Sequence, residues 1–544
     1  MKQNKIKNLL LTILALFLGV PAFAQVGIGT TNPQGVLDVK IANDNAMGIV
    51  LPRVEKVDDV KTPDGEEAII GTMVFDLSKN CARVKNSTGW SNCLLDDEGL
   101  TKVTTDYLGL GSNVLAAKIA VSQNWSLILG AAHELYFSGN NNYGQSGLGR
   151  AGGAVRSFTL VLSAYPIEDI AAGLNHAIAA DATGRVWTWG GNTGGYFQTG
   201  QTGPNAAGTA IVYLGNASFT LPDSCDFFGP NGVTFTPNTP PTSTPVPQNP
   251  KLLAKLVAAT NAASFVVVND GDLYSIGTSP ANGKGVASTA TLGWSQVTIP
   301  GNGKVAQISA SLNNSTGVVT TDGYVYTWGT GANGGLGSGG TSNVATPAQI
   351  NFGSDNGKIG KIAMGYQCGA AITQDGMKLY AWGARYAFGN VASSPGNITT
   401  PQDITSYIQG FNAANGDRII DVSMGRYSTG GNIVVVTKRA DGSSGVYVAG
   451  ANSYGQLGVG NTTNQRTQGQ LVSINWLRMG SNTQIVGAAS GDRNTVLLTV
   501  TGEGDNQQPG VAYGAGRAGT SNTDNYRVLG ALNGNQTYFT AMTK

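Results

Sequence analysis

The chain is poor in the residues on which most enzymes depend. It contains only 2 histidines and 4 cysteines in 544 residues, and charged residues make up 12% of it, against a typical ~25%. So little histidine leaves little room for a serine-histidine triad or a histidine-rich zinc site. The formal net charge of +1 also argues against nucleic-acid binding, which needs a basic face. These shortages, together with 78 glycines, predict a turn-rich β protein that is not an enzyme and holds no cofactor or metal.

The sequence also lacks an apolar run long enough to predict a membrane span. The run Leu9–Val20 covers twelve residues, whereas a transmembrane helix needs about 20. Three lysines precede this run, and Ala22-Phe23-Ala24 follows it. That order is typical of a secretory signal peptide. We therefore expect residues 1–24 to be removed on export, leaving a mature chain that begins at Gln25 with 30 basic and 32 acidic residues.

What the sequence does contain is a repeat. Seven short strands end in glycine, and their terminal glycines are 51, 87, 52, 54, 67 and 66 residues apart. A unit of this length cannot bury its apolar face alone, so copies must stack on one another. Most copies also pair two strands across Asp-Gly or a close variant, which is a strong hairpin signal and excludes a helical solenoid. The seven strands are Leu135–Gly139, Val186–Gly190, Leu273–Gly277, Val325–Gly329, Leu379–Gly383, Val446–Gly450 and Val511–Gly516.

The repeat resembles the regulator of chromosome condensation repeat, which combines a hairpin ending in Trp-Gly with a following Asn-x-x-Gly-Gln-Leu-Gly loop. Ala171–Asn192 carries the first part, and Asn141–Gly149 and Ala451–Thr467 carry the second. The resemblance implies an all-β, seven-bladed β-propeller over residues 101–544, closed on itself so that no sheet edge stays exposed. A closing strand is expected from Tyr526–Leu532 or from the stretch near Val114–Val121. The resemblance also implies a rigid disc that binds other proteins.

The segment 25–100 does not share the repeat, and we expect a small β-rich region there. It resembles the leader region of exported Bacteroidetes proteins. Cys81 and Cys93 bracket an Asn-Ser-Thr-Gly turn, and in an exported protein this arrangement favours a disulfide over a metal site. Cys225 and Cys368 leave two alternatives open, a second disulfide or two buried free thiols.

Several conspicuous residues have a structural explanation. His176 occupies a repeated position, which favours packing between blades over catalysis. The acidic side chains before Gly in the hairpins recur at one place in successive copies, so turn chemistry explains them better than calcium binding. A proline-rich insertion at about 201–251 predicts an extended loop. Aromatic and arginine side chains near that insertion, or in place of the repeat's own loop, are the predicted partner-binding residues: Tyr196, Phe197, Phe227, Phe228, Arg385, Tyr386 and Phe388.

The function expected from these features is docking on a cell-envelope protein. The sequence favours residence in the periplasm, and a plug or adaptor of the outer-membrane channel of the type IX secretion system is the most specific hypothesis. Two alternatives stay open. One is a released inhibitor or adhesin, and the other is an enzyme that acts on glycans at the centre of the ring, which would require paired carboxylates at the axis.

Overall fold

The computed structural model divides into two compact units, Met1–Leu108 and Gly109–Lys544. In the first unit it describes residues 26–28, 37–39, 53–61, 67–70, 72–77, 81–86 and 89–90. In the second unit it describes residues 115–542 except for 131–132, 149–150, 163–165, 183, 192–211, 214–232, 235–252, 286–291, 390–396, 427–430, 468, 475–483, 502–507, 519–527, 530–531 and 533. The expected signal peptide, residues 1–24, lies outside the described residues.

The first unit consists of short strands. One sheet pairs β1 with β2, and another has the order β3-β4-β5-β6. Ile69 and Ile70 are about 70% exposed at this unit's surface. Cys81 begins β5, but Cys93 lies outside the described residues, so their disulfide stays a prediction. The elements are β1 (Val26–Ile28), β2 (Leu37–Val39), β3 (Arg53–Val54), the 3-10 helix η1 (Val57–Asp59), β4 (Met73–Asp76), β5 (Cys81–Asn86) and β6 (Gly89–Trp90).

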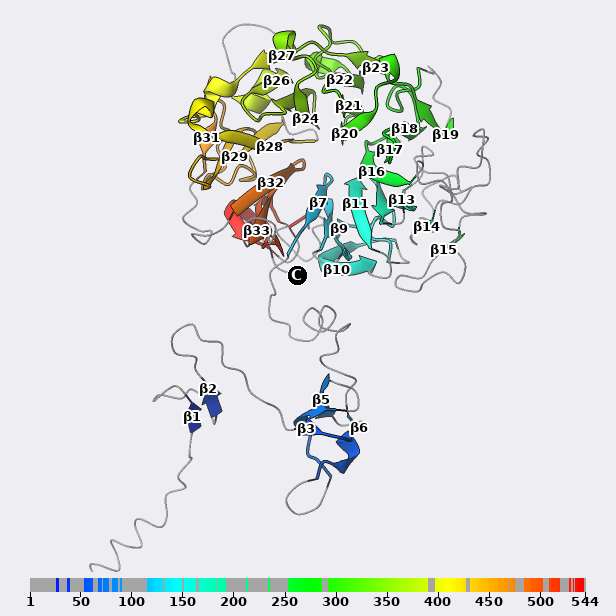
Figure 1. Cartoon of the computed structure of the whole chain (residues 1–544), viewed down its shortest axis with the longest axis vertical. Coiled ribbons are helices and arrows are strands. Elements are labelled where there is room, and N and C mark those ends of the chain that lie inside the picture. The colour runs from blue at the N-terminus through cyan, green and yellow to red at the C-terminus, as the bar shows by residue number, and fades with distance from the viewer. Residues whose placement is uncertain are drawn as a thin grey trace, which may run out of the picture. The chain divides into compact units, whose positions relative to one another are not determined.

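The described strands of the second unit form seven antiparallel sheets that follow one another around a ring (Figure 1). The first six strand sequences found in the repeat each form the third strand of a sheet, and most of the last one lies in β35, which is third in the order β32-β33-β35-β36. We number the sheets 1 to 7 in chain order. Sheets 1 to 4 contain β7 (Lys118–Val121), β8 (Trp125–Leu129), β9 (Leu135–Asn140) and β10 (Ala154–Leu162); β11 (Ile167–Ala172), β12 (His176–Asp181), β13 (Val186–Gly190), β14 (Val212–Tyr213) and β15 (Val233–Thr234); β16 (Ala254–Ala259), β17 (Ala263–Val268), β18 (Leu273–Gly277) and β19 (Leu292–Val297); β20 (Val305–Ala310), β21 (Ser315–Thr320), β22 (Val325–Gly329) and β23 (Val344–Gln349). Sheets 5 to 7 contain β24 (Ile359–Gly365), β25 (Cys368–Thr373), β26 (Leu379–Gly383) and β27 (Ile398–Asp403); β28 (Arg418–Met424), β29 (Asn432–Lys438), β30 (Ser444–Gly450) and β31 (Val472–Ser473); β32 (Gln484–Ser490), β33 (Asn494–Thr501), β34 (Gln508–Pro509), β35 (Tyr513–Arg517) and β36 (Asn535–Ala541).

The all-β class predicted from the sequence is confirmed. The described residues include no α-helix, and their only helical segments are single 3-10 turns. None of those segments has the length and apolar character that a membrane crossing requires. In the second unit the 3-10 turns are η4 (Pro300–Asn302), η5 (Ala332–Gly334), η6 (Gly353–Asp355), η7 (Arg385–Phe388), η8 (Thr405–Tyr407) and η9 (Ala413–Asn415).

The tryptophans of the Trp-Gly strands join neighbouring sheets. Trp189, Trp328 and Trp382 are fully buried. Each indole N–H donates to a carbonyl in the loop that follows the third strand of the preceding sheet, at 2.6 Å for Trp189 to Gln145, 3.1 Å for Trp328 to Ala281 and 3.0 Å for Trp382 to Gly335. A buried indole N–H needs such a partner. The repeated aromatic therefore packs its own sheet and also fixes the loop of the sheet before it.

This contact explains a glycine in the loop. Gly283 has φ +73, and a Cβ built on it would lie 2.7 Å from Nε1 of Trp328. We expect Gly283→Ala to lower the free energy of unfolding by about 3 kcal/mol, because left-handed strain adds to a clash with a buried ring. Gly353 is the matched control, since it has φ +64 but no atom within 4 Å of a built Cβ. Gly353→Ala should cost only about 1 kcal/mol; equal losses in urea unfolding would contradict the packing explanation.

Sheets 1 and 7 close the ring largely through side-chain packing. One hydrophobic cluster contains Ile119 and Ile128 of sheet 1 together with Val496 of sheet 7. The Ser126 hydroxyl donates to the carbonyl of Val528 at 2.7 Å. The stretch near Val114–Val121 was expected to complete another sheet. It contributes a single bridge to sheet 7, between Leu115 and Val511, and otherwise forms β7 of sheet 1. Most of the alternative stretch, Tyr526–Leu532, lies outside the described residues.

Candidate functional site

The direction of the strands gives the ring two different faces. Successive first strands are hydrogen-bonded with a constant offset of one residue from the equivalent position: Gln307 of β20 accepts from the amide of Ile362 in β24 at 3.0 Å, and Asp421 of β28 accepts from that of Ala488 in β32 at 2.7 Å. The first strands therefore run side by side in the same direction. We call the face where the first and third strands end the loop face. The opposite face, which carries the tight turns between the second and third strands, is the turn face.

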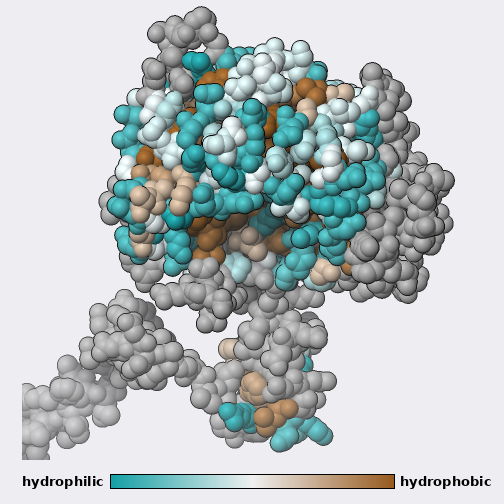
Figure 2. Space-filling view, turned by 45° about the horizontal axis from the view of Figure 1, so that its top comes forward, coloured by the Kyte–Doolittle hydropathy of each residue, from teal (hydrophilic) through white to brown (hydrophobic). Residues whose placement is uncertain are grey.

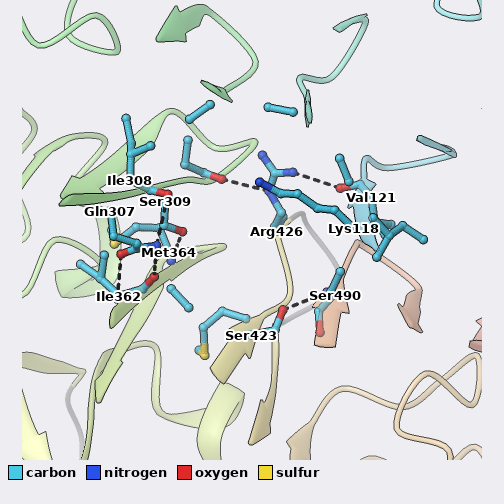
Figure 3. Close-up of a pocket in the computed structure, with 18 of the residues that line it drawn as sticks. Lys118, Val121, Gln307, Ile308, Ser309, Ile362, Met364, Ser423, Arg426 and Ser490 are labelled. Carbon is cyan, nitrogen blue, oxygen red and sulfur yellow. Dashed lines mark hydrogen bonds between the residues drawn. The ribbon is translucent and has the colours of Figure 1, made fainter. Parts of the chain in front are cut away.

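The first strands surround a cavity of about 360 Å³ at the centre of the ring (Figure 3). In six of the seven first strands a β-bulge immediately precedes the same inward position. Bulges re-aim side chains, which explains why this position faces the cavity. In sheets 1 to 6 the position is occupied by residues that line the cavity, and in sheet 7 by a glycine that does not: Lys118, Asp169, Leu256, Gln307, Lys361, Asp421 and Gly487.

The charged groups of the cavity form ion pairs with one another and hydrogen bonds with the backbone. Lys118 pairs with Asp169, and Lys361 pairs with Asp421. The second oxygen of Asp169 accepts from the amide of Val257 at 2.7 Å, much as that of Asp421 does from Ala488. Each carboxylate therefore links its own sheet to both neighbours. The sequence predicted no reactive centre, and it did not foresee that ionisable side chains line the axis.

Arg426 crosses the loop-face end of the cavity (Figure 3). Its guanidinium donates to three backbone carbonyls, those of Ala310 at 2.9 Å, Val121 at 3.1 Å and Ala259 at 2.8 Å. These acceptors belong to sheets 4, 1 and 3, whereas Arg426 follows β28 of sheet 6. Burial lowers the pKa of the guanidinium to about 10, so the group still carries its charge at neutral pH. Arg426 thus ties four sheets together across the axis.

The two faces differ in charge. Among the described residues, the loop-face end of the ring carries seven basic side chains and one acidic side chain, and the turn-face end carries thirteen acidic and ten basic side chains. The loop-face residues are Arg156, Lys284, Arg385, Arg426, Arg466, Arg493, Arg517 and Asp492. The turn-face acids are Glu134, Glu168, Asp169, Asp181, Asp270, Asp272, Asp322, Asp355, Asp375, Asp403, Asp417, Asp421 and Asp441, and the bases are Lys118, Arg185, Lys255, Lys304, Lys358, Lys361, Lys378, Arg418, Lys438 and Arg439.

Arginine and tyrosine side chains come together on the loop face of sheets 5 to 7. The guanidinium of Arg466 lies 5.4 Å from the ring centre of Tyr386. The ring of Tyr454 has two such neighbours, Arg493 at 4.7 Å and Arg517 at 5.6 Å. All five side chains, and Arg385 beside Tyr386, are half-buried. We call Arg385, Arg466, Arg493 and Arg517 the arginine cluster.

The structure describes three of the predicted partner-binding residues. Arg385 and Tyr386 are half-buried in η7 on the loop face, and their docking role stays a prediction. Phe388 is fully buried in the hydrophobic core between sheets 5 and 6, so it supports the loop and does not face outward. The others, Tyr196, Phe197, Phe227 and Phe228, lie outside the described residues.

Sequence reasoning missed Arg426, Arg466, Arg493 and Arg517. One signal was available: Arg426 follows Gly425, and Arg493 lies two residues after Gly491, at the same loop of consecutive copies. Aligning the copies at this loop would have placed both arginines at one face. The surface shown in Figure 2 is mainly hydrophilic, with only small hydrophobic areas. No group of three or more His, Cys, Asp or Glu that could hold a metal ion occurs in the described part of the chain.

The hairpin carboxylates act in turns, as the sequence predicted. Asp375 accepts from the hydroxyl of Thr373 at 2.6 Å and from the amide of Met377 at 3.0 Å. These bonds, that from Thr373 foremost, hold the pKa of Asp375 below its usual value. Asp441 accepts from the amide of Ser443 at 2.9 Å in the same way. Each carboxylate is used by its own turn.

Cys368 is a free cysteine, and it is fully buried. Burial raises the pKa of its thiol, which keeps the sulfur protonated and unreactive. The structure therefore matches the buried-thiol alternative for this residue. Cys225 lies outside the described residues.

His176 is fully buried between sheets 2 and 3, where its Nε2 lies 2.9 Å from the hydroxyl of Ser264. Burial lowers its pKa from 6.5 to about 3. Between these values the unfolded chain binds a proton that the folded chain does not. The free energy of unfolding should therefore fall as the pH falls below 6.5, by about 1.4 kcal/mol per pH unit from this residue alone.

Urea unfolding at pH 7, 6 and 5 should show this loss of stability. In His176→Asn the free energy of unfolding should fall less steeply with decreasing pH below ~6.5. The comparison concerns the slope with pH, because the substitution also changes stability at neutral pH. Identical slopes in the two proteins would show that the imidazole of His176 is protonated inside the folded protein.

Comparison with known proteins identifies the repeat. Residues 322–372 and 167–195 match family models described as regulator of chromosome condensation (RCC1) repeat. The chain is 27% identical over 342 residues to the ultraviolet-B receptor UVR8 of Arabidopsis thaliana, covering 61% of this chain and 64% of the receptor. It is 26% identical to the human E3 ubiquitin-protein ligase HERC2, of which the match spans only 6%.

Solved structures give the same fold. The yeast RCC1 protein Prp20, solved bound to Kap60, superposes with a TM-score of 0.53 at 17% identity, over 79% of this chain and 85% of Prp20. Human WBSCR16 superposes with a TM-score of 0.52 at 17% identity, over 72% of this chain and 88% of WBSCR16. Repeat and architecture agree, and the chain is an RCC-like repeat β-propeller.

Proposed function

We propose that this chain is a non-enzymatic, exported propeller that docks on another protein through one face of its ring. The observation that carries the proposal is the state of the central cavity. Its carboxylates and ammonium groups neutralise one another, and Arg426 is bound to three carbonyls. Groups engaged in this way hold sheets in place and are poorly suited to proton transfer. The loops at the rims are left as the surface that can meet a partner.

Related propellers support a binding role. Prp20 was solved in complex with Kap60, and its binding to Gsp1p and histones is described with a second structure. These partners belong to Prp20. The signal peptide expected at residues 1–24 would export the present chain, so its partner would be an envelope protein. An outer-membrane channel, with the type IX translocon as the specific candidate, would fit a rigid disc in the periplasm.

Affinity purification of the tagged full-length chain from periplasmic, membrane and medium fractions tests this proposal. We expect the mature chain in the periplasmic or membrane fraction, together with an outer-membrane protein in comparable amount. Recovery alone from every fraction would refute the docking role. Recovery from the medium with a different partner would favour the released inhibitor or adhesin.

The glycan-enzyme alternative also has an observation in its favour, because Asp169 and Asp421 do line the axis. Each of them, however, binds a lysine and a backbone amide at once. A general acid needs an oxygen that is free to approach the substrate. Asp169→Asn and Asp421→Asn should therefore change stability without removing any glycan-cleaving activity that the purified chain shows.

A further inference from the structure

We infer that the loop face of sheets 5 to 7 binds an acidic segment of a partner protein through the arginine cluster. This inference rests on the proposed function in one respect, that the partner is a protein. It adds the face that binds and the chemistry that is recognised. Arg426 is not part of the binding surface, because its donors are used inside the ring.

The first support is charge without a counter-charge. Arg385 and Arg466 form no ion pair with any described carboxylate, and the Nε of each is buried without a hydrogen-bond partner in that part of the chain. The one described acid at this end of the ring, Asp492, is 0% exposed and lies 3.2 Å from Nε of Arg493. Arg385 and Arg466 therefore carry positive charge that no described carboxylate neutralises. A carboxylate from outside that meets the accessible side of these half-buried guanidinium groups would supply a counter-charge.

The second support is that three of the four arginines of the cluster are already packed against aromatic rings. Arg466 is packed against Tyr386, and Arg493 and Arg517 against Tyr454. Contact with an aromatic ring limits the rotamers of a guanidinium before any partner arrives. Ordering in advance lowers the entropy lost on binding. Arginine and tyrosine are also among the residues that most often dominate protein interfaces.

The chemistry favours an acidic protein segment over a phosphate polymer or a lipid surface. The cluster contains arginine and no lysine, and its planar groups alternate with tyrosine rings, which suits carboxylates presented next to apolar or aromatic side chains. Its extent is limited to three sheets, and the turn-face end of the same ring has more acids than bases. A long polyanion would find few further positive charges beyond the cluster. A short acidic segment could pair with the arginines over its whole length.

The test uses the mature full-length chain and a fluorescent decapeptide in which glutamate alternates with tyrosine and glycine. Fluorescence anisotropy should show binding that weakens at least tenfold between 50 and 300 mM NaCl, about the loss expected when several exposed ion pairs are screened. The same peptide with glutamine in place of glutamate should bind at least tenfold more weakly, on the order of one charged pair lost.

Variants locate the site. Arg385→Gln/Arg466→Gln should weaken binding at least tenfold, about 1.4 kcal/mol. The matched control is Lys255→Gln/Lys438→Gln, which makes the same change in charge at exposed positions of the turn face and should leave binding unchanged. Arg385→Lys/Arg466→Lys keeps the charge but loses the planar donors, so an intermediate loss is expected. Thermal unfolding of each variant checks that it is folded.

Three outcomes would overturn the inference: no salt-dependent binding of the glutamate peptide, equal losses in the loop-face and turn-face variants, or tighter binding of a single-stranded oligonucleotide or of phosphatidylglycerol vesicles than of the peptide. None of these outcomes tests the docking role itself, which is tested by the affinity purification described above. A partner that is recovered there and still binds Arg385→Gln/Arg466→Gln would refute the arginine cluster alone.

Discussion

Replacing Arg426 with methionine is expected to lower the free energy of unfolding by about 3 to 5 kcal/mol, since three buried carbonyls lose their donor together. Those carbonyls belong to Val121, Ala259 and Ala310, on three different sheets. Methionine keeps much of the side-chain volume, so the loss reports the hydrogen bonds more than the packing. Urea unfolding followed by tryptophan fluorescence measures the change.

Two further variants give the Arg426 result its meaning. Lysine at 426 keeps the charge but cannot donate in three directions, so Arg426→Lys should lose about half as much stability. Lys438→Met removes a positive charge from an exposed site on the turn face and should change stability by less than about 0.5 kcal/mol. If Arg426→Met were as mild as Lys438→Met, water would be able to replace the guanidinium at the axis.

Replacing Trp382 with alanine is expected to cost about 4 kcal/mol, because a fully buried indole leaves a large cavity. Trp382 packs edge-on against Phe352 with ring centres 6.0 Å apart, and it donates to the carbonyl of Gly335 at 3.0 Å. The variant therefore loosens sheet 5 and also frees the loop after the third strand of sheet 4. Both changes act on one interface between sheets.

Trp382→Phe separates the two contributions. Phenylalanine retains most of the apolar contact but lacks the N–H, so this variant should lose about 1 to 2 kcal/mol. Hydrogen exchange of the loop amides near Gly335 should increase in both variants. Unchanged exchange in Trp382→Ala would show that the loop is held by its own turns and not by the indole.

The sequence could predict the sheets because the information is local and repeated. An apolar strand, a turn at Asp-Gly and an aromatic strand ending in glycine occur within about twenty residues, as in the segment that forms β21 (Ser315–Thr320) and β22 (Val325–Gly329). Asp375 and Asp441 could be assigned to turns for the same reason. Local patterns of this kind do not depend on which sheet comes next.

The axis and the loop face could not be predicted in that way. Lys118 and Asp169 are 51 positions apart, and Arg426 reaches Val121 across 305 positions. Nothing in either segment reveals that the other lies beside it until the ring is closed. The burial of Phe388 could not be predicted for the same reason. Its loop departs from the repeat, which suggested that the side chain is exposed. The phenyl ring instead packs into the hydrophobic cluster between sheets 5 and 6.

The bonds of Arg426 also constrain how such a chain can change in evolution. A stack of repeats that is open at both ends can gain or lose a copy and still satisfy its neighbours. Here one side chain bonds to three other copies across a shared centre, so deleting any of those copies removes an acceptor and alters the distance to the rest. Length variation should therefore collect in the peripheral loops, while the number of copies stays constant among close relatives.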